Sequence, residues 1–143
     1  MSGKSFLDTN VLVYAQDGRY PAKQRLARAL ATRLIVEGTG VISTQVLQEF
    51  HVAATTKLGV DPLAAKAVLR SFSAFETVQV TAQLVEEAVD CSVLSRISFW
   101  DALIVAAAAS AGCTTLYSED LQSGREFYGL KVVNPFIRDT EKG

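Results

Sequence analysis

The sequence predicts a single α/β domain in which a mostly parallel sheet of four to five strands carries helices on both faces. Short apolar runs, typical of buried parallel strands, alternate with longer segments that have helical periodicity and helix-capping residues. Of the 143 residues, 49% are hydrophobic and 20% are charged, which suits one compact domain. We expect the domain to span residues 1–137 and a polar tail to span residues 138–143.

The apolar runs define the expected strands. The first run ends in Asp8-Thr9-Asn10, which suits a turn from a strand into a helix. In the third run apolar and polar residues alternate, and this pattern predicts an edge or half-buried position in the sheet. The expected strands cover residues 5–7, 41–42, 76–81, 114–117 and 131–133.

Capping residues and helix-ending glycines mark the helices between these strands. The helix that Pro21 opens carries Leu26, Leu30 and Leu34 at intervals of four, which predicts one apolar face. Ser, Thr or Asp stands before most of the other helical segments, as helix N-termini prefer. The expected helices cover residues 11–14, 21–37, 44–58, 82–95 and 99–111, and a further helix opens at Pro62.

Composition and motifs argue against several classes of function. The formal charge is −1, so any nucleic-acid site must be a local basic patch. Cys91 and Cys113 are isolated from each other and from His51, the only histidine, which argues against zinc and suits buried thiols in a reducing compartment. We find no glycine-rich phosphate loop and no serine nucleophile elbow. Without a signal core or a membrane-length apolar stretch, a cytoplasmic location away from membranes is expected.

Four acidic residues interrupt segments that otherwise resemble protein core: Asp8, Glu49, Asp101 and Asp120. Asp8 and Asp120 follow strands, at the sheet edge where α/β proteins bind ligands. Glu49 and Asp101 lie early in helices that can reach the same edge. Two carboxylates about 4 Å apart repel by about 4 kcal/mol at an effective dielectric of about 20, so such a cluster needs a cation. Because all the ligands are oxygens, the pattern favours Mg²⁺ or Mn²⁺, which can activate a bound water for hydrolysis.

Each acid also has a purely structural interpretation. Asp8 is a good helix N-cap, and Asp101 occupies the acidic position of a capping box. Glu49 lies on a polar stripe that suits either a cleft or a solvated surface. Glu119 precedes Asp120, so either carboxylate could face the site. The four acids taken together favour metal binding, with Asp8 and Asp101 as the firmest candidates.

A basic run early in the chain offers contacts for nucleic acid. No acidic residue lies between Arg19 and Glu37, and the lysine and arginines of this stretch could contact RNA phosphates. The alternative is an ordinary solvated helix face. The candidate RNA-binding residues are Arg19, Lys23, Arg25 and Arg28.

These motifs, in this order, give the chain a resemblance to the PIN domain family, and specifically to the VapC-type ribonuclease toxins of type II toxin–antitoxin systems. The resemblance covers nearly the whole chain. It rests on Phe6-Leu7-Asp8-Thr9-Asn10-Val11, on Glu49, on Phe99-Trp100-Asp101-Ala102-Leu103-Ile104, and on Ser118-Glu119-Asp120-Leu121-Gln122 followed by Val132-Val133-Asn134-Pro135-Phe136.

The resemblance implies an endoribonuclease that uses Mg²⁺ or Mn²⁺, a strand order of 3-2-1-4-5, a homodimer, and a cognate antitoxin protein that masks the acidic site. Asp8 and Asp101 would be the principal metal ligands. Asp120 would complete the metal site, and Glu49 would bind metal or orient water in catalysis. Ser118 stands where the family often has Thr, which keeps the hydroxyl. The supporting hydroxyl and amide groups would come from Thr9, Asn10 and Ser118.

Two other classes of function stay open. A PIN-like domain can serve as a metal-binding or protein-binding module without catalysis. A receiver-like phosphoacceptor domain also gathers acids around Mg²⁺, but it needs paired acids after its first strand and a lysine near its last strand tips. Here Asp8 is followed by Thr9-Asn10, and Lys131 opens its strand rather than ending it.

Overall fold

One six-stranded sheet organises residues 3–137, the part of the chain that the structure, a computed structural model, describes. The strand order is β3-β2-β1-β4-β6-β5, and all neighbours are parallel except β5 and β6. The first, second, third and fourth expected strands correspond to β1 to β4, and the expected fifth strand is β6, but the third strand ends at Val78 rather than at residue 81. The strands are β1 (Lys4–Leu7), β2 (Gly40–Ser43), β3 (Glu76–Val78), β4 (Cys113–Tyr117), β5 (Glu126–Phe127) and β6 (Leu130–Val133).

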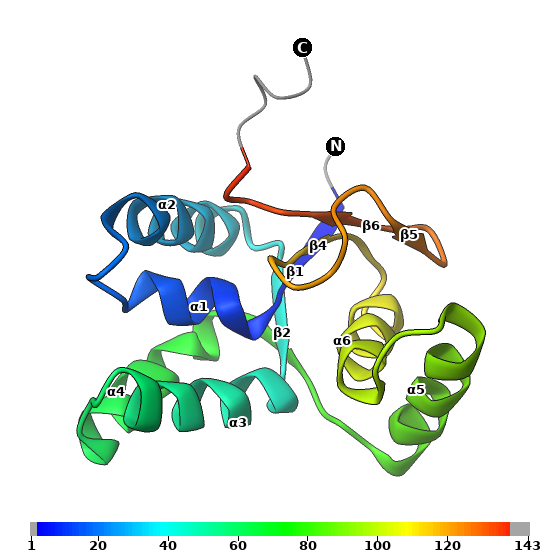
Figure 1. Cartoon of the computed structure of the whole chain (residues 1–143), viewed down its shortest axis with the longest axis horizontal. Helices are drawn as coiled ribbons and strands as arrows, with labels where there is room; N and C mark the ends of the chain where they lie inside the picture. The colour runs from blue at the N-terminus through cyan, green and yellow to red at the C-terminus, as the bar shows by residue number, and fades with distance from the viewer. Residues whose placement is uncertain (1–2, 138–143) are drawn as a thin grey trace.

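Helices cover the sheet on both sides, as predicted. Figure 1 shows α1 to α4 on one side of the central strands and α5 and α6 on the other. Within residues 3–137 no single helix is long and apolar enough to cross a membrane; only α5 and α6 together, bent by 114°, reach that length and composition. The helices are α1 (Thr9–Ala15), α2 (Pro21–Glu37), α3 (Thr44–Val52), α4 (Pro62–Ser71), α5 (Ala82–Ser95) and α6 (Phe99–Ser110).

Side-chain caps fix where the helices begin. The hydroxyl of Ser43 accepts a hydrogen bond from the backbone of α3, that of Thr81 from α5 and that of Ser98 from α6, at 3.0–3.3 Å. Each such cap stabilises a helix by about 1 kcal/mol. The caps therefore leave little freedom to the beginnings of α3 and α6, which carry Glu49 in the second turn of α3 and Asp101 in the first turn of α6.

Three further details of the fold differ from the sequence-based expectation. Leu26 is 47% exposed, because the buried face of α2 runs through Ala27, Leu30 and Leu34 instead. The sheet has six strands rather than four or five, because the two-residue strand β5 pairs back onto β6 through Tyr128-Gly129. Both turn residues have positive φ, 52° and 82°, as a tight hairpin requires. The expected polar tail at residues 138–143 lies outside the described residues.

The third difference lies after α3, within the expected helix 44–58. The α-helix ends at Val52 and continues as a π-helical turn over Ala53–Lys57. The backbone N–H of Leu58 donates to the carbonyl of Ala53 at 3.1 Å, five residues back. Side-chain periodicity over a single widened turn does not distinguish it from an α-turn, so it could not be recognised from the sequence.

The core places the carboxyl ends of β1 and β4 side by side. Phe6, Leu7 and Leu116 are fully buried, and Leu7 pairs with Tyr117 in the parallel register. The pairing extends past the strand ends, because the N–H of Asp8 donates to the carbonyl of Tyr117 at 3.0 Å. The residues that directly follow these two strands are therefore held next to each other.

Candidate active site

Asp8 is buried at the carboxyl end of β1, and each of its two carboxylate oxygens accepts a hydrogen bond. Only 5% of the residue is exposed. Its Oδ1 accepts the backbone N–H of Thr9 at 2.7 Å, so the predicted capping role is present. Its Oδ2 accepts the hydroxyl of Ser118 at 2.8 Å. Both hydrogen bonds fix the direction in which the carboxylate faces.

Ser118 connects Asp8 to the loop that follows β4. The residue is fully buried, and its Oγ also accepts the backbone N–H groups of Asp120 and Leu121 at 3.2 and 3.3 Å. One hydroxyl thus orients the buried carboxylate and shapes the loop that carries the exposed Asp120. The supporting role expected for Ser118 has a clear geometric basis.

Glu49 reaches the same edge from α3. Its Oε1 accepts the hydroxyl of Thr9 at 2.6 Å, and its Oε2 accepts the side-chain amide of Gln45 at 3.2 Å. The same amide nitrogen donates to the carbonyl of Trp100 at the start of α6, also at 3.2 Å. Gln45 therefore ties α3 to α6, and Thr9 ties Glu49 to the residue beside Asp8.

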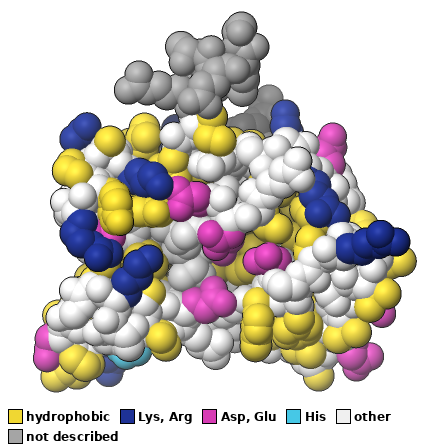
Figure 2. All heavy atoms as spheres, viewed as in Figure 1, with side chains coloured by type: hydrophobic (Ala, Val, Ile, Leu, Met, Phe, Trp, Pro, Cys, Tyr) yellow, Lys and Arg dark blue, Asp and Glu magenta, His cyan; other side chains and the backbone are white. Residues whose placement is uncertain are grey.

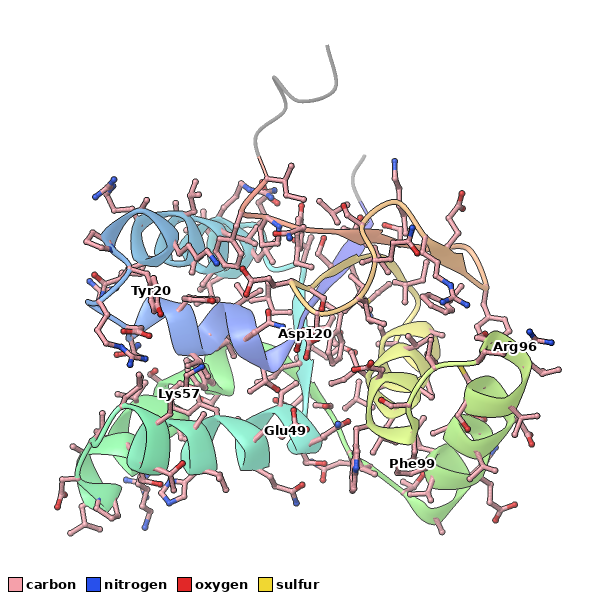
Figure 3. The ribbon with its side chains drawn as sticks, in the orientation of Figure 1. Tyr20, Glu49, Lys57, Arg96, Phe99 and Asp120 are labelled. Atoms are coloured by element: carbon pink, nitrogen blue, oxygen red, sulfur yellow. The ribbon has the colours of Figure 1, made fainter. Side chains whose placement is uncertain are left out.

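Asp101 lies in the first turn of α6 and Asp120 in the loop after β4. The backbone N–H of Asp101 donates to the Oγ of Ser98 at 3.0 Å, which completes the predicted helix cap. Figure 3 shows Asp120 and Glu49 near the middle of the molecule, on opposite sides of the space beside the strand tips. The negative charges of these two residues act on both Asp8 and Asp101.

Glu119 does not share the position of Asp120. Its Oε1 accepts the hydroxyl of Tyr14 at 2.9 Å, and its Oε2 forms an ion pair with Lys23. The backbone N–H of Glu119 donates to the side-chain oxygen of Asn10 at 3.3 Å. Three residues from α1 and α2 therefore hold Glu119, whereas Asp120 is the acid of this pair that acts on Asp8 and Asp101.

Burial and mutual repulsion make two of the carboxylic acids weaker than usual. Burial, reinforced by the charges of Asp120 and Glu49, raises the pKa of Asp8 from its ordinary 3.8 to about 6, even though Ser118 and Thr9 oppose the rise by hydrogen bonding. Burial and the same two charges also raise the pKa of Asp101, against a hydrogen bond from Ser98. A cation beside these groups would relieve both effects.

The donor set suits a hard divalent cation that keeps part of its water shell. The candidate ligands are all carboxylate oxygens, which Mg²⁺ and Mn²⁺ prefer. Within residues 3–137, however, no three His, Cys, Asp or Glu side chains are arranged to hold a metal ion. Mg²⁺ is commonly bound by one or two carboxylates together with waters and substrate oxygens. The chemistry of the residues therefore fits such an ion, whereas a closed cage of protein ligands is not formed.

A pocket of about 310 Å³ opens beside the acids, between α1, α3 and the loop after β4. Figure 2 shows the acidic side chains gathered at the centre of this face, with lysine and arginine side chains beside them. The pocket is lined by Thr9, Asn10, Val13, Tyr14, Asp17, Glu49, Ala53, Lys57, Glu119 and Asp120.

Three of the four candidate RNA-binding residues contact protein groups near this pocket. Arg19 makes two hydrogen bonds to the carboxylate of Asp17, at 2.9 and 3.0 Å. Lys23 pairs with Glu119, and the Nε of Arg28 donates to the carbonyl of Ala15 at 2.7 Å. Arg25 is exposed on α2. The basic stretch thus lies beside the acids, and a role for it in RNA binding stays a prediction.

The pocket residues that sequence reasoning did not single out include Tyr14 and Lys57. Tyr14 lies one helical turn after Asn10, and this spacing is a signal that both face the loop after β4. Lys57 lies eight residues after Glu49. In a regular α-helix that spacing leaves the two residues about 80° apart, on one broad face, so the intervals of four between Glu49, Ala53 and Lys57 were a signal that could have placed Lys57 on the side of Glu49.

Comparison with known proteins identifies the type of domain. The family model of the PIN domain matches residues 5–125. Sequence comparison finds no match among curated proteins.

Solved structures of three bacterial proteins share the fold. A toxin–antitoxin complex from Klebsiella pneumoniae is 20% identical, with 92% of this chain and 98% of that chain covered at a TM-score of 0.70. DNA-bound VapBC from Salmonella typhimurium is 20% identical, with coverages of 91% and 96% and a TM-score of 0.64. The sarcin–ricin loop cleaving toxin VapC20 from Mycobacterium tuberculosis is 24% identical, with coverages of 82% and 90% and a TM-score of 0.60.

Proposed function

The chain belongs to the PIN domain family, and from this premise we propose that it is a metal-dependent endoribonuclease that hydrolyses RNA phosphodiester bonds. The observation that carries the proposal is the gathering of Asp8, Glu49, Asp101 and Asp120 at one sheet edge, where the pKa values of Asp8 and Asp101 are raised by burial and by the other acids. Burying a carboxylate beside other acids is costly unless a cation compensates the charge. Acidic groups whose pKa values are shifted in this way are concentrated at functional sites.

Asp8 and Asp101 are the proposed direct ligands of Mg²⁺ or Mn²⁺, with Asp120 completing the site. When bound, the ion would lower the pKa of a coordinated water and neutralise charge on the phosphate. Ser118 and the N–H of Thr9 hold the carboxylate of Asp8 in one orientation. These contacts leave the carboxylate little freedom to turn away, which is the preorganisation that catalysis requires.

Glu49 is the proposed acceptor for the attacking water. Hydrogen bonds from Thr9 and Gln45 occupy one position on each of its oxygens and hold the carboxylate in one orientation. The remaining lone pairs can orient a water molecule and accept its proton. Attack on phosphorus with departure of the 3′ oxygen would leave a 5′-phosphate on one fragment and a 3′-hydroxyl on the other.

The fold neighbours suggest the biological setting. The Klebsiella structure is a toxin–antitoxin complex, the Salmonella structure is VapBC bound to DNA, and the Mycobacterium protein is a toxin that cleaves the sarcin–ricin loop. By analogy we propose that this protein is the toxin of a type II pair, that it acts in the cytoplasm as a homodimer, and that a cognate antitoxin protein covers its acidic site.

The proposal is tested by incubating the protein with structured RNA in Mg²⁺ or Mn²⁺. Asp8→Asn and Asp101→Asn should each abolish cleavage. Asp90→Asn, an exposed acid on α5, serves as the matched control and should cleave like the natural protein. The ends of the fragments identify the chemistry. Equal cleavage by all four proteins would place the activity elsewhere and refute this site.

A non-catalytic module is the second candidate function. The observation that favours it is the lack, within residues 3–137, of three acids arranged around one point. Such a module would leave RNA intact, whether it binds Mn²⁺ with a rise in melting temperature or binds only a protein. A ligand at 100 times its Kd stabilises a fold by about 2.7 kcal/mol, so a melting series in Mn²⁺ combined with the cleavage assay separates the two candidates.

A further inference from the structure

The π-helical turn after α3 sets the direction of Lys57. In a regular α-helix, a residue eight positions after Glu49 would be rotated from it by about 80°. A π-turn closes over five residues rather than four, so each residue in it turns the chain by less. As a result Glu49, Ala53 and Lys57 all line the same pocket. Figure 3 shows Lys57 between α3 and α1, on the same side of α3 as Glu49.

Two threonines satisfy the backbone where the helix widens. The hydroxyl of Thr55 donates to the carbonyl of His51 at 2.9 Å, and that of Thr56 donates to the carbonyl of Val52 at 2.6 Å. A widened turn loses regular backbone hydrogen bonds, and these hydroxyls supply partners for the carbonyls. The π-turn is therefore built into the local sequence.

Lys57 differs from Arg19 and Lys23 in forming no ion pair with any residue that the structure describes, although its charge also acts on Asp17. Arg19 is paired with Asp17, and Lys23 is paired with Glu119. Among the described residues, no carboxylate oxygen lies within ion-pair distance of the Lys57 ammonium. The side chain is exposed and lines the pocket that the acids border. Of the acids that line the pocket, Asp17 and Glu119 are paired with Arg19 and Lys23, whereas Glu49 and Asp120 form no ion pair with a described residue. Lys57 thus offers a positive charge beside Glu49 and Asp120.

We propose that Lys57 binds a backbone phosphate of the RNA strand and so holds the strand across the acidic cluster. This inference rests on the proposed function. RNA carries one negative charge per nucleotide, and the acids repel it unless a nearby cation compensates. The pocket volume of about 310 Å³ lies at the lower end of ligand sites, which suits a single nucleotide unit. Lysine acts there as a flexible point charge.

Binding of a fluorescein-labelled stem–loop RNA, followed by fluorescence anisotropy over a series of KCl concentrations, tests this role. The measurement uses full-length protein carrying Asp101→Asn, so that RNA is not cut. Lys57→Gln should weaken binding about tenfold, as expected for one lost contact to a charged group. The slope of log Kd against log salt should fall by about 0.7, the value for one phosphate contact on a single strand.

Two further variants serve as controls. Lys57→Arg keeps the charge and should restore both the affinity and the salt slope. Lys66→Gln removes the same charge from the exposed face of α4, outside the pocket, and should change neither. Because Lys57 and Lys66 are exposed, all variants should keep the parent's melting temperature.

The outcomes distinguish this inference from the proposed function. If the natural protein cleaves RNA but Lys57→Gln binds with the parent's Kd and salt slope, the role of Lys57 is refuted and the nuclease stands. An equal loss in Lys66→Gln would also refute it, because the effect would then reflect total charge. If the natural protein neither binds nor cleaves RNA, the proposed function fails and the role of Lys57 fails with it.

Discussion

Replacement of Asp8 by asparagine is expected to stabilise the metal-free protein while removing its activity. Burial raises the pKa of Asp8 from 3.8 to about 6. A rise of that size corresponds to about 3 kcal/mol of unfavourable free energy for holding the carboxylate charged in the folded state. Asparagine has nearly the same shape, and its oxygen can still accept the N–H of Thr9. Its amide nitrogen cannot accept the hydroxyl of Ser118, whose oxygen already accepts two N–H groups. The carboxamide should therefore remove the cost of the charge but lose one hydrogen bond, which costs about 1 kcal/mol.

The sign of the pH dependence follows from the raised pKa. Between pH 3.8 and about 6, folded Asp8 keeps a proton that the unfolded chain releases. The stability gained from this proton is fully present below pH 3.8 and is lost as the pH rises through about 6. The net gain at pH 7 is about 2 kcal/mol once the lost hydrogen bond is subtracted. In metal-free buffer, Asp8→Asn should therefore melt about 4–8 °C above the natural protein at pH 7, taking about 2–4 °C per kcal/mol for a domain of this size. Below pH 4 this advantage should disappear and Asp8→Asn should melt at or slightly below the natural protein.

Thermal melts of both proteins in EDTA, followed by circular dichroism from pH 4 to pH 8, measure this difference. Asp90→Asn, which removes an exposed carboxylate from α5, should show no such gap. Adding Mn²⁺ should raise the melting temperature of the natural protein and leave that of Asp8→Asn nearly unchanged. If Asp8→Asn melts below the natural protein at pH 7, or if the gap does not depend on pH, the charged carboxylate of Asp8 does not destabilise the metal-free fold and this reasoning is refuted.

Substitutions at three further positions test the supporting structure. Ser118→Ala removes a buried hydroxyl that makes three hydrogen bonds, and it should lower the free energy of unfolding by about 1–3 kcal/mol, measured by chemical denaturation. Ser118→Thr keeps the hydroxyl and should cost less. Lys23→Met breaks the partly exposed ion pair with Glu119 and should lower the free energy of unfolding by under about 1 kcal/mol. It should leave the salt slope of RNA binding unchanged. A reduced slope would show that Lys23 contacts RNA instead. Gly40→Ala would place a methyl group 2.6 Å from the ring of Phe75, and a loss of about 1–3 kcal/mol is expected; an unchanged denaturation midpoint would contradict that packing.

Local chemistry explains why most of the fold could be predicted from the sequence. The caps at Ser43, Thr81 and Ser98 act within three residues of themselves, so their effect is visible in the sequence. Alternation in the third strand predicted its position at the edge of the sheet, and β3 lies at that edge. The short strand β5 was missed because two residues carry no periodicity.

The site was harder to predict because its details depend on contacts between distant segments. Glu119 and Asp120 are equivalent candidates in the sequence, and the contacts of Glu119 with Tyr14 and Lys23, which lie about a hundred residues away, separate them. The direction of Lys57 depends on a widened helical turn rather than on residue type. The four acids, in contrast, were recognisable because charged residues are rare in segments that otherwise form core.

RNA cleavage during metal titration tests the central claim most directly. The protein is first stripped with EDTA and dialysed, and the initial rate of cleavage of a stem–loop RNA is measured as MnCl₂ is added back. A metal-dependent ribonuclease should be inactive without metal, gain activity saturably with Mn²⁺, and lose that response in Asp101→Asn but not in Asp90→Asn. Cleavage that persists in excess EDTA, or an Asp101→Asn protein that responds like the natural one, would contradict the account.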